Sequence, residues 1–161
     1  MEIIRLQPED TERFLAFRAN GLASEPHAFR YAPEDDVALS APAWRARLRN
    51  DVVVAAKMED AWLGIGGLAR LTGSRLRHKG LIWGMYVVPD ARGTGAANGI
   101  MTALVSHAHD GIRQLQLTVM ADNARARVFY ERHGFKTYAI EPASVRRGAT
   151  YADEALMWRH L

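Results

Sequence analysis

Apolar residues recur along the chain with two different spacings, which separates the expected helices from the expected strands. After Pro8, the apolar residues Phe14, Leu15, Phe17 and Leu22 recur at the spacing of one face of a helix. Apolar runs bounded by polar or turn-forming residues instead indicate strands. We expect strands at 2–6, 52–56, 62–71, 81–88, 115–120, 135–140 and 155–158. We expect further helices at 42–49, from the residues after Gly95 to about Gly111, and at 123–133.

This order of elements predicts a mixed sheet with helices on its faces. Residues 23–40 have no clear periodicity and are expected to be irregular, while Gly73-Ser74 and Arg146-Arg147-Gly148 read as turns. The chain has 161 residues, 48% of them hydrophobic and 24% charged, which fits a single domain spanning 1–161.

Composition excludes several kinds of chemistry. The chain has no cysteine, so it has no thiolate nucleophile, disulfide or zinc-thiolate site. The histidine spacing has no metal-site signature, and we expect no metal. The net charge is +3 with scattered arginines, so we expect no nucleic-acid partner. No signal peptide or membrane-spanning run is visible, which favours a cytoplasmic protein without a membrane partner.

The segment after the strand at 81–88 carries the strongest functional signal. Pro89 ends the apolar run, Arg92, Gly93 and Gly95 follow in a short loop, and a helical pattern then begins. Backbone N–H groups at a helix N-terminus lack intrahelical acceptors and lie at the positive end of the helix dipole. Glycine lets such a backbone approach a bulky anion. The segment therefore predicts a phosphate-binding loop, with a ligand-free turn as the alternative.

Two common nucleotide-binding motifs do not fit this loop. A Walker A motif needs a Gly-Lys pair, and none occurs near Gly95. A dinucleotide-binding motif needs a third glycine where the chain has Asn98, and it belongs in an early strand–helix–strand unit.

A second segment narrows the interpretation. Residues Arg92 to Ala97 match the pattern Arg/Gln-x-x-Gly-x-Gly/Ala, and Asn123, Tyr130 and Gly134-Phe135 follow after an intervening strand. In this order the two segments resemble those of the GNAT (Gcn5-related) N-acetyltransferase superfamily. The resemblance implies an α/β (α+β) fold, in which a mixed, mostly antiparallel, splayed sheet of six to seven strands carries about four helices. It also implies acetyl-CoA as the acyl donor.

The resemblance assigns the donor site mainly to backbone groups. It implies that the loop residues hold the CoA pyrophosphate: Arg92, Gly93, Thr94, Gly95, Ala96 and Ala97. It implies a strand bulge at Tyr86, Val87 and Val88, whose exposed backbone groups pair with the pantetheine amides. Asn123 would bind the pantetheine arm, although a helix N-cap needs the same residue type. Arg127 would contact a CoA phosphate or remain solvated.

The resemblance makes Tyr130 the general acid that protonates the departing CoA thiolate. A phenol with a pKa of about 10 stays protonated at neutral pH and has a proton to give. The alternative is a tyrosine of the core. Many family members carry a glutamate on the strand before the glycine loop, but residues 78–86 contain no carboxylate. His78 is then a candidate base or an inert surface residue.

The acceptor pocket is the part that the sequence describes least. The fold implied by the resemblance would place Phe29 and Glu34 on one side and Tyr151 and Glu154 on the other. We expect an N-acetyltransferase that acts on a small-molecule amine or an exposed protein amine. A non-catalytic acyl-CoA-binding sensor or scaffold and transfer to aminoacyl-tRNA are the alternatives. A monomer and a homodimer are both compatible with the sequence.

Overall fold

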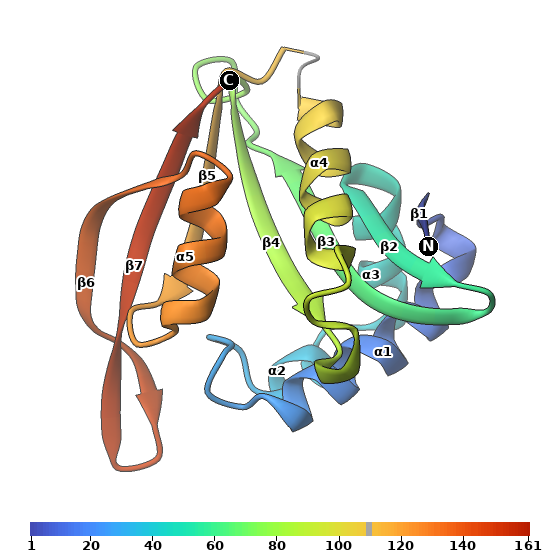
Figure 1. The fold of residues 1–161 in the computed structure, drawn as a ribbon, viewed down its shortest axis with the longest axis horizontal. Helices are drawn as coiled ribbons and strands as arrows, with labels where there is room; N and C mark the ends of the chain where they lie inside the picture. The colour runs from blue at the N-terminus through green and yellow to red at the C-terminus, as the bar shows by residue number, and fades with distance from the viewer. Residues whose placement is uncertain (109–110) are drawn as a thin grey trace.

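Seven strands form one sheet in the computed structural model, which describes residues 1–108 and 111–161 (Figure 1). The elements are β1 (Glu2–Arg5), η1 (Pro8–Asp10), α1 (Thr11–Ser24), α2 (Pro33–Ala38), α3 (Ala41–Asn50), β2 (Val52–Met58), β3 (Ala61–Arg70), β4 (Lys79–Val87), η2 (Pro89–Ala91), α4 (Ala96–Ala108), β5 (Gln114–Met120), α5 (Ala124–Arg132), β6 (Lys136–Arg147) and β7 (Thr150–His160). The strand order is β1-β2-β3-β4-β5-β7-β6, and only β4 and β5 run parallel. The expected mixed, mostly antiparallel sheet is confirmed.

Helix α2 lies in a segment that we expected to be irregular. Pro33 begins it, and the side chain of Asp35 accepts a hydrogen bond from the backbone N–H of Ala32 at 2.8 Å. Proline at the first helical position and acidic residues in the first turn both favour a helix start, even in a helix too short to show a periodic pattern. No helix in the described part of the chain is long and apolar enough to cross a membrane.

The hairpin of β6 and β7 is longer than expected. The expected strands ended at Ile140 and began at Ala155, whereas the two strands pair as far as Arg147 and Thr150. The turn therefore lies at 148–149 rather than at 146–148. A register shift between Glu141 and Val145 interrupts the ladder. Most of β6 is exposed, so no alternation of apolar residues marks its length.

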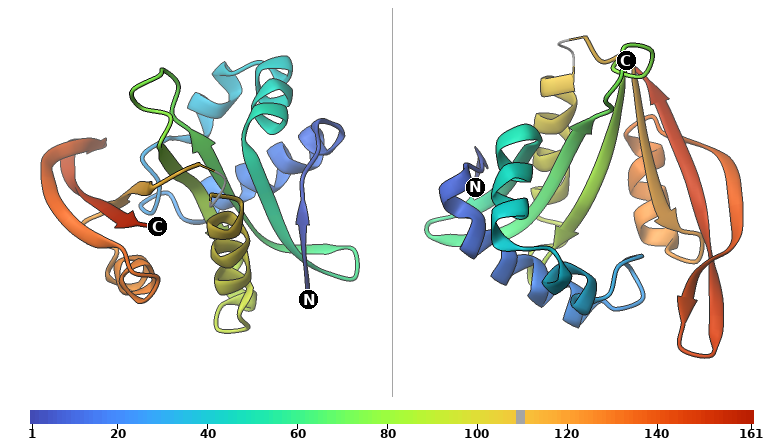
Figure 2. Two further views of the ribbon diagram at one scale, coloured as in Figure 1. Left: turned by 90° about the horizontal axis from the view of Figure 1, so that it is seen from above. Right: turned by 180° about the vertical axis from the view of Figure 1, so that it is seen from behind.

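Helices cover both faces of the sheet, with α1 to α3 on one face and α4 and α5 on the other (Figure 2). Because successive side chains of a strand point to opposite faces, β2 supplies both cores. Val53 belongs to the core beneath α1 and α3, which also contains Trp44. Val54 belongs to the core beneath α4, which also contains Leu104.

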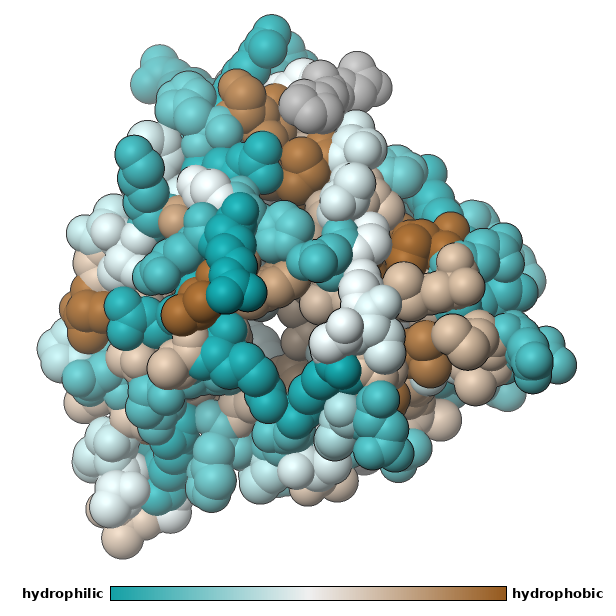
Figure 3. Space-filling model, in the orientation of Figure 1, coloured by the Kyte–Doolittle hydropathy of each residue, from teal (hydrophilic) through white to brown (hydrophobic). Residues whose placement is uncertain are grey.

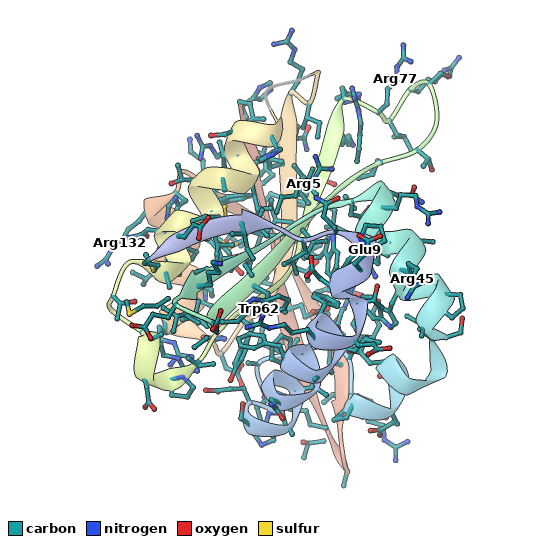
Figure 4. All side chains as sticks on the ribbon, turned by 90° about the vertical axis from the view of Figure 1, so that its right-hand side faces the viewer. Arg5, Glu9, Arg45, Trp62, Arg77 and Arg132 are labelled. Carbon is teal, nitrogen blue, oxygen red and sulfur yellow. The ribbon has the colours of Figure 1, made fainter. Side chains whose placement is uncertain are left out.

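Close packing explains two glycines in the middle of β3. A Cβ on Gly66 would lie 2.7 Å from Cγ2 of Ile100, and one on Gly67 would lie 2.3 Å from Cε2 of Trp83. The bare backbone therefore lets α4 pack on one face and Trp83 on the other. Trp62 of the same strand, labelled in Figure 4, contacts α1 through Phe17, with ring centroids 5.9 Å apart.

Candidate active site

The sheet divides where its two parallel strands separate. β4 and β5 pair only from Lys79 to Leu81, opposite Gln114 to Gln116. Beyond these pairs β5 continues along β7, and the gap from β4 widens (Figure 1). A cavity of about 940 Å³ occupies this cleft. The space-filling view shows a hollow in this region, bordered by both hydrophilic and hydrophobic residues (Figure 3). The expected splay is confirmed.

The bulge in β4 lies upstream of its expected position. Tyr86 pairs with Ile65 and Trp83 with Gly67, so β4 has an extra residue between these pairs. Gly84 lies there with a φ of +64°, a conformation that side-chain-bearing residues rarely adopt. The prediction of a bulge at 86–88 is therefore wrong.

The pairing beside the cleft also corrects the role expected for Val88. Its N–H donates to the carbonyl of Leu63 at 2.9 Å, and its own carbonyl accepts from Ala91 at 3.0 Å. The backbone N–H of Val88 is therefore not free to bind a ligand. Tyr86 and Val87 line the cavity.

The loop after β4 changes direction at two glycines. Gly93 has a φ of +80° and Gly95 a φ of +93°. A Cβ on Gly93 would meet no atom within 4 Å, so the space beside the loop is open. Thr94 faces its own loop, since its hydroxyl donates to the carbonyl of Ala91 at 2.7 Å. The turn therefore depends on glycine, and the Thr94 hydroxyl is already used.

The loop places the N-terminus of α4 at the cleft. The first helical bond there is donated by Gly99 to the carbonyl of Gly95 at 2.9 Å. Among the described residues no backbone acceptor faces the N–H groups of Ala96, Ala97 and Asn98. Of these residues, Ala97 and Asn98 line the cavity, whereas Ala96 is buried. Free N–H groups at the positive end of a helix dipole form an anion-binding site.

Arg92 lines the cavity but already has a partner. Its Nη2 donates to Oε1 of Glu25, at the end of α1, and Glu25 lines the cavity as well. The carboxylate offsets the positive charge of Arg92 beside the loop. No local pattern indicates this pairing, because the two residues lie 67 positions apart.

Asn123 and Arg127 hold the start of α5. The side-chain oxygen of Asn123 accepts from the N–H of Ala126 at 3.1 Å, so the interpretation as an N-cap is confirmed. Asn123 also lines the cavity. Arg127 instead donates through Nη1 to the carbonyl of Ala121 at 3.2 Å and does not line the cavity.

Tyr130 is the buried residue of α5, and it lines the cleft. It is 9% exposed, and its ring lies 6.0 Å from that of Phe135, centroid to centroid. Burial raises the pKa of Tyr130 above its usual value because it penalises the phenolate. The phenol therefore remains protonated at neutral pH. Tyr130 therefore packs in the core and still reaches the cavity, and its role as the general acid stays a prediction.

The expected acceptor residues divide into two groups. Phe29 and Glu154 line the cavity. Glu34 is exposed on α2, and Tyr151 is 66% exposed near the tip of the hairpin. Neither of them lines the cavity. The hairpin extends past the cleft, which moves Tyr151 away from the position expected for shorter strands.

Glu154 is buried at the wall of the cavity. It is 1% exposed, and its Oε2 accepts from Nη2 of Arg30 at 2.5 Å and from Oγ of Ser144 at 2.6 Å. These two donors stabilise a carboxylate that would otherwise be costly to bury.

Comparison with known proteins decides the family. The sequence model of the acetyltransferase (GNAT) family matches residues 16–135, well over half of the chain. The chain belongs to the GNAT acetyltransferase family. Comparison with curated protein sequences gives no significant match.

Solved structures share the GNAT fold over the whole chain. A GNAT acetyltransferase from Streptococcus pneumoniae superimposes with a TM-score of 0.88 at 21% identity, covering 99% of both chains. A ribosomal-protein-alanine N-acetyltransferase from Brucella melitensis gives 0.82 at 19% identity, covering 100% of both. A putative acetyltransferase from Salmonella typhimurium, solved with its cofactor acetyl-CoA, gives 0.83 at 16% identity, covering 100% of this chain and 94% of that one. At these identities the likeness concerns the fold.

The GNAT cleft also contains arginines that sequence reasoning did not place there. Arg18 of α1 is 7% exposed and forms an ion pair with Asp36. Arg47 of α3 lies 3.8 Å over the ring of Trp83 and forms an ion pair with Asp51. Both arginines line the cavity. Arg18 lies on the apolar face of α1, in phase with Phe14 and Leu22. An arginine at such a position is the sequence signal that could have revealed it.

Proposed function

We propose that this GNAT protein transfers the acetyl group of acetyl-CoA directly to a primary amine, with Tyr130 as the general acid. The amine belongs to a small molecule or is an exposed amine of a protein. The observation that carries the proposal is one cavity that combines a buried, protonated phenol with an unpaired helix N-terminus. The first group suits proton donation, and the second suits a diphosphate.

The donor is held mainly by the backbone in this proposal. The free N–H groups at the start of α4 bind the pyrophosphate, with the loop at Gly93 and Gly95 providing close approach. The pantetheine arm lies along the separated edge of β4 at Tyr86 and Val87, with Asn123 on the opposite side. The Salmonella structure with acetyl-CoA, which shares this fold, supports the choice of donor.

The chemistry needs no nucleophile from the protein. The amine nitrogen attacks the thioester carbonyl, so a C–N bond forms and the C–S bond breaks. Tyr130 gives its proton to the leaving thiolate. A phenol is protonated at neutral pH and has a proton to give, and the thiol that forms has a pKa of about 8.5 to 10.

The experiment that tests this proposal replaces Tyr130 with phenylalanine. General acid catalysis commonly contributes about 10² to 10⁴ in rate, so we expect Tyr130→Phe to lower kcat at least about 100-fold. The Kd for acetyl-CoA, measured by calorimetry, should not change. Tyr138→Phe is the matched control, because Tyr138 is 55% exposed on β6 and does not line the cavity.

Three results would contradict the proposal in different ways. An unchanged kcat for Tyr130→Phe, with chemistry rate-limiting, would remove its role as the acid. If acetyl-CoA raises the melting temperature but a broad amine panel releases no CoA thiol, the protein is an acyl-CoA sensor or scaffold instead. Failure of saturating acetyl-CoA to raise the melting temperature would exclude it as the donor.

A further inference from the structure

Two buried charged side chains at the cleft each have one polar atom without a partner among the residues that the structure describes. Glu154 of β7 is 1% exposed and Arg18 of α1 is 7% exposed, yet both line the cavity. Because both side chains line the cavity, a ligand there can pair with the polar atom that each of them has left.

The unused atom of Glu154 is Oε1. Its other oxygen is occupied by Arg30 and Ser144, at 2.5 and 2.6 Å. Within the described ranges Oε1 has no hydrogen-bond or ion-pair partner. Two donors on one oxygen fix the carboxylate and leave the second oxygen able to accept from an ammonium group.

The unused atom of Arg18 is Nη1. Its Nε and Nη2 donate to the two carboxylate oxygens of Asp36, at 2.5 and 3.1 Å. Nη1 has no acceptor in the part of the chain that the structure describes. A Cβ on Gly84 would lie 3.3 Å from Nη1, which places this nitrogen against the bulge of β4. The two-bond pair with Asp36 fixes the plane of the guanidinium, so its free N–H groups have a set direction.

We infer that the acceptor is an amine that also carries a carboxylate, of the amino-acid type, with Glu154 holding its ammonium group and Arg18 its carboxylate. The inference rests on the proposed acetyl transfer and selects a small molecule over a protein amine. A carboxylate suits Arg18 better than a neutral carbonyl does, because charge-assisted hydrogen bonds to guanidinium are stronger. Arg47 adds a second guanidinium to this side of the cavity, over Trp83.

The same arrangement supplies the proton acceptor that β4 lacks. The bound ammonium gives one proton to Oε1 of Glu154, which frees the nitrogen lone pair to form the C–N bond as the C–S bond breaks. Tyr130 gives its proton to the thiolate, and the second proton lost by the nitrogen restores Tyr130 through solvent. Glu154 then releases its proton to solvent, so each turnover yields an amide, CoA thiol and one proton.

Matched acceptors test the inference on the unaltered protein. A panel of α-, β- and γ-amino acids is compared with the corresponding amino amides, and turnover is measured as release of CoA thiol from acetyl-CoA. The panel varies the distance between the amine and the carboxylate. We expect kcat/KM for the preferred acid to exceed that for its amide at least tenfold. Amides that are equal or better would overturn the inference and leave the proposed acetyl transfer standing.

A variant of Arg18 then tests whether this residue binds the carboxylate of the acceptor. Arg18→Lys keeps a cation for Asp36 but removes the guanidinium, so the KM for the acid should rise and the preference over the amide should fall towards one. Turnover of the amide should fall less than that of the acid, because a neutral carbonyl pairs with the guanidinium more weakly than a carboxylate does. Arg13→Lys, on the same helix but outside the cavity, should leave the preference unaltered. An equal loss for acid and amide in Arg18→Lys would mean a purely structural role and would contradict the assignment.

The ammonium site has its own variant and readout. Glu154→Gln keeps the acceptor for Arg30 and Ser144 but removes the charge, so it should lower kcat/KM for acid and amide alike. If no amine is acetylated at all, the proposed transfer fails, and calorimetry with the same amino acids on the CoA-bound protein decides the site. Binding that Arg18→Lys abolishes would support the site, and absence of binding would overturn it.

Discussion

The donor half and the acceptor half of the cleft are built from different parts of the polypeptide. In the donor half, which comprises β4, the loop at 89–95 and the start of α4, backbone groups face the cavity. In the acceptor half, which comprises α1, the segment at 25–32 and β7, ion-paired side chains do so. A backbone site requires only residues that let the chain turn, and a short motif encodes it. A side-chain site requires partners from distant positions, such as Arg30 and Glu154, 124 residues apart.

The largest effect that would test this contrast is expected at Gly95. An alanine there must adopt a φ near +93°, which costs side-chain-bearing residues about 1–2 kcal/mol. We expect Gly95→Ala to move the amides at the start of α4 and to weaken acetyl-CoA binding at least about tenfold, which is 1.4 kcal/mol. Calorimetric titration measures the affinity, and urea unfolding measures the stability.

Gly73 provides the control for this substitution. Its φ is +95° and no atom lies within 4 Å of a Cβ placed on it, so Gly73→Ala imposes the same backbone strain in the turn after β3. We expect a similar loss of stability with an unchanged Kd for acetyl-CoA. Equal affinities for the two variants would mean that the backbone of the loop does not hold the donor.

A smaller effect is expected at the side chain of Arg92. Because Glu25 already pairs with it, and because partly exposed ion pairs contribute about 0–1 kcal/mol, Arg92→Gln should weaken acetyl-CoA binding no more than about threefold. Glu25→Gln frees the guanidinium and should tighten binding slightly, an effect that added salt reduces. A loss above tenfold in Arg92→Gln would show that a side chain, rather than the backbone, dominates the donor half.

The smallest effect is expected in the ultraviolet titration of Tyr130, which lies between the two halves. Burial raises its pKa, so the folded protein keeps this phenol neutral where an exposed tyrosine ionises, at about pH 10. In an ultraviolet titration near pH 10, Tyr130→Phe should therefore give almost the same phenolate signal as the unaltered protein. Above that pH the unfolded state releases the Tyr130 proton first, so the contribution of Tyr130 to stability declines as the pH rises. Loss of a phenolate signal in Tyr130→Phe near pH 10 would contradict the burial argument.

The fold was predictable where a pattern repeats within one element. The apolar runs of β2 and β5 and the glycine loop after β4 agree with the structure to within a few residues. Helix α2 was missed because six residues are too few for a helical period. The length of β6 was missed because most of this strand is exposed and selects no apolar face.

The candidate site was predictable for the same reason and to a similar extent. Asn123 and Tyr130 lie two helical turns apart on α5, and both line the cavity, as their spacing indicates. The ion pairs of Arg18 and of Arg30 depend on tertiary contacts that no local spacing encodes. The bulge lies at Gly84 rather than at 86–88, because the register with β3, and not the sequence of β4 alone, decides where the extra residue fits.

The short junction between β4 and β5 has a mechanical consequence. Three residue pairs, from Lys79–Gln114 to Leu81–Gln116, join the half-sheet of β1 to β4 to the half-sheet of β5 to β7. The junction lies at one end of the cleft, so few main-chain bonds set the angle between the half-sheets. In the proposed complex, the pantetheine amides of the donor pair with the free edge of β4 and its arm contacts Asn123. The donor would then connect the two half-sheets and help to fix the angle between them. The reagent that the reaction consumes would then also hold the acceptor half in position for the reaction.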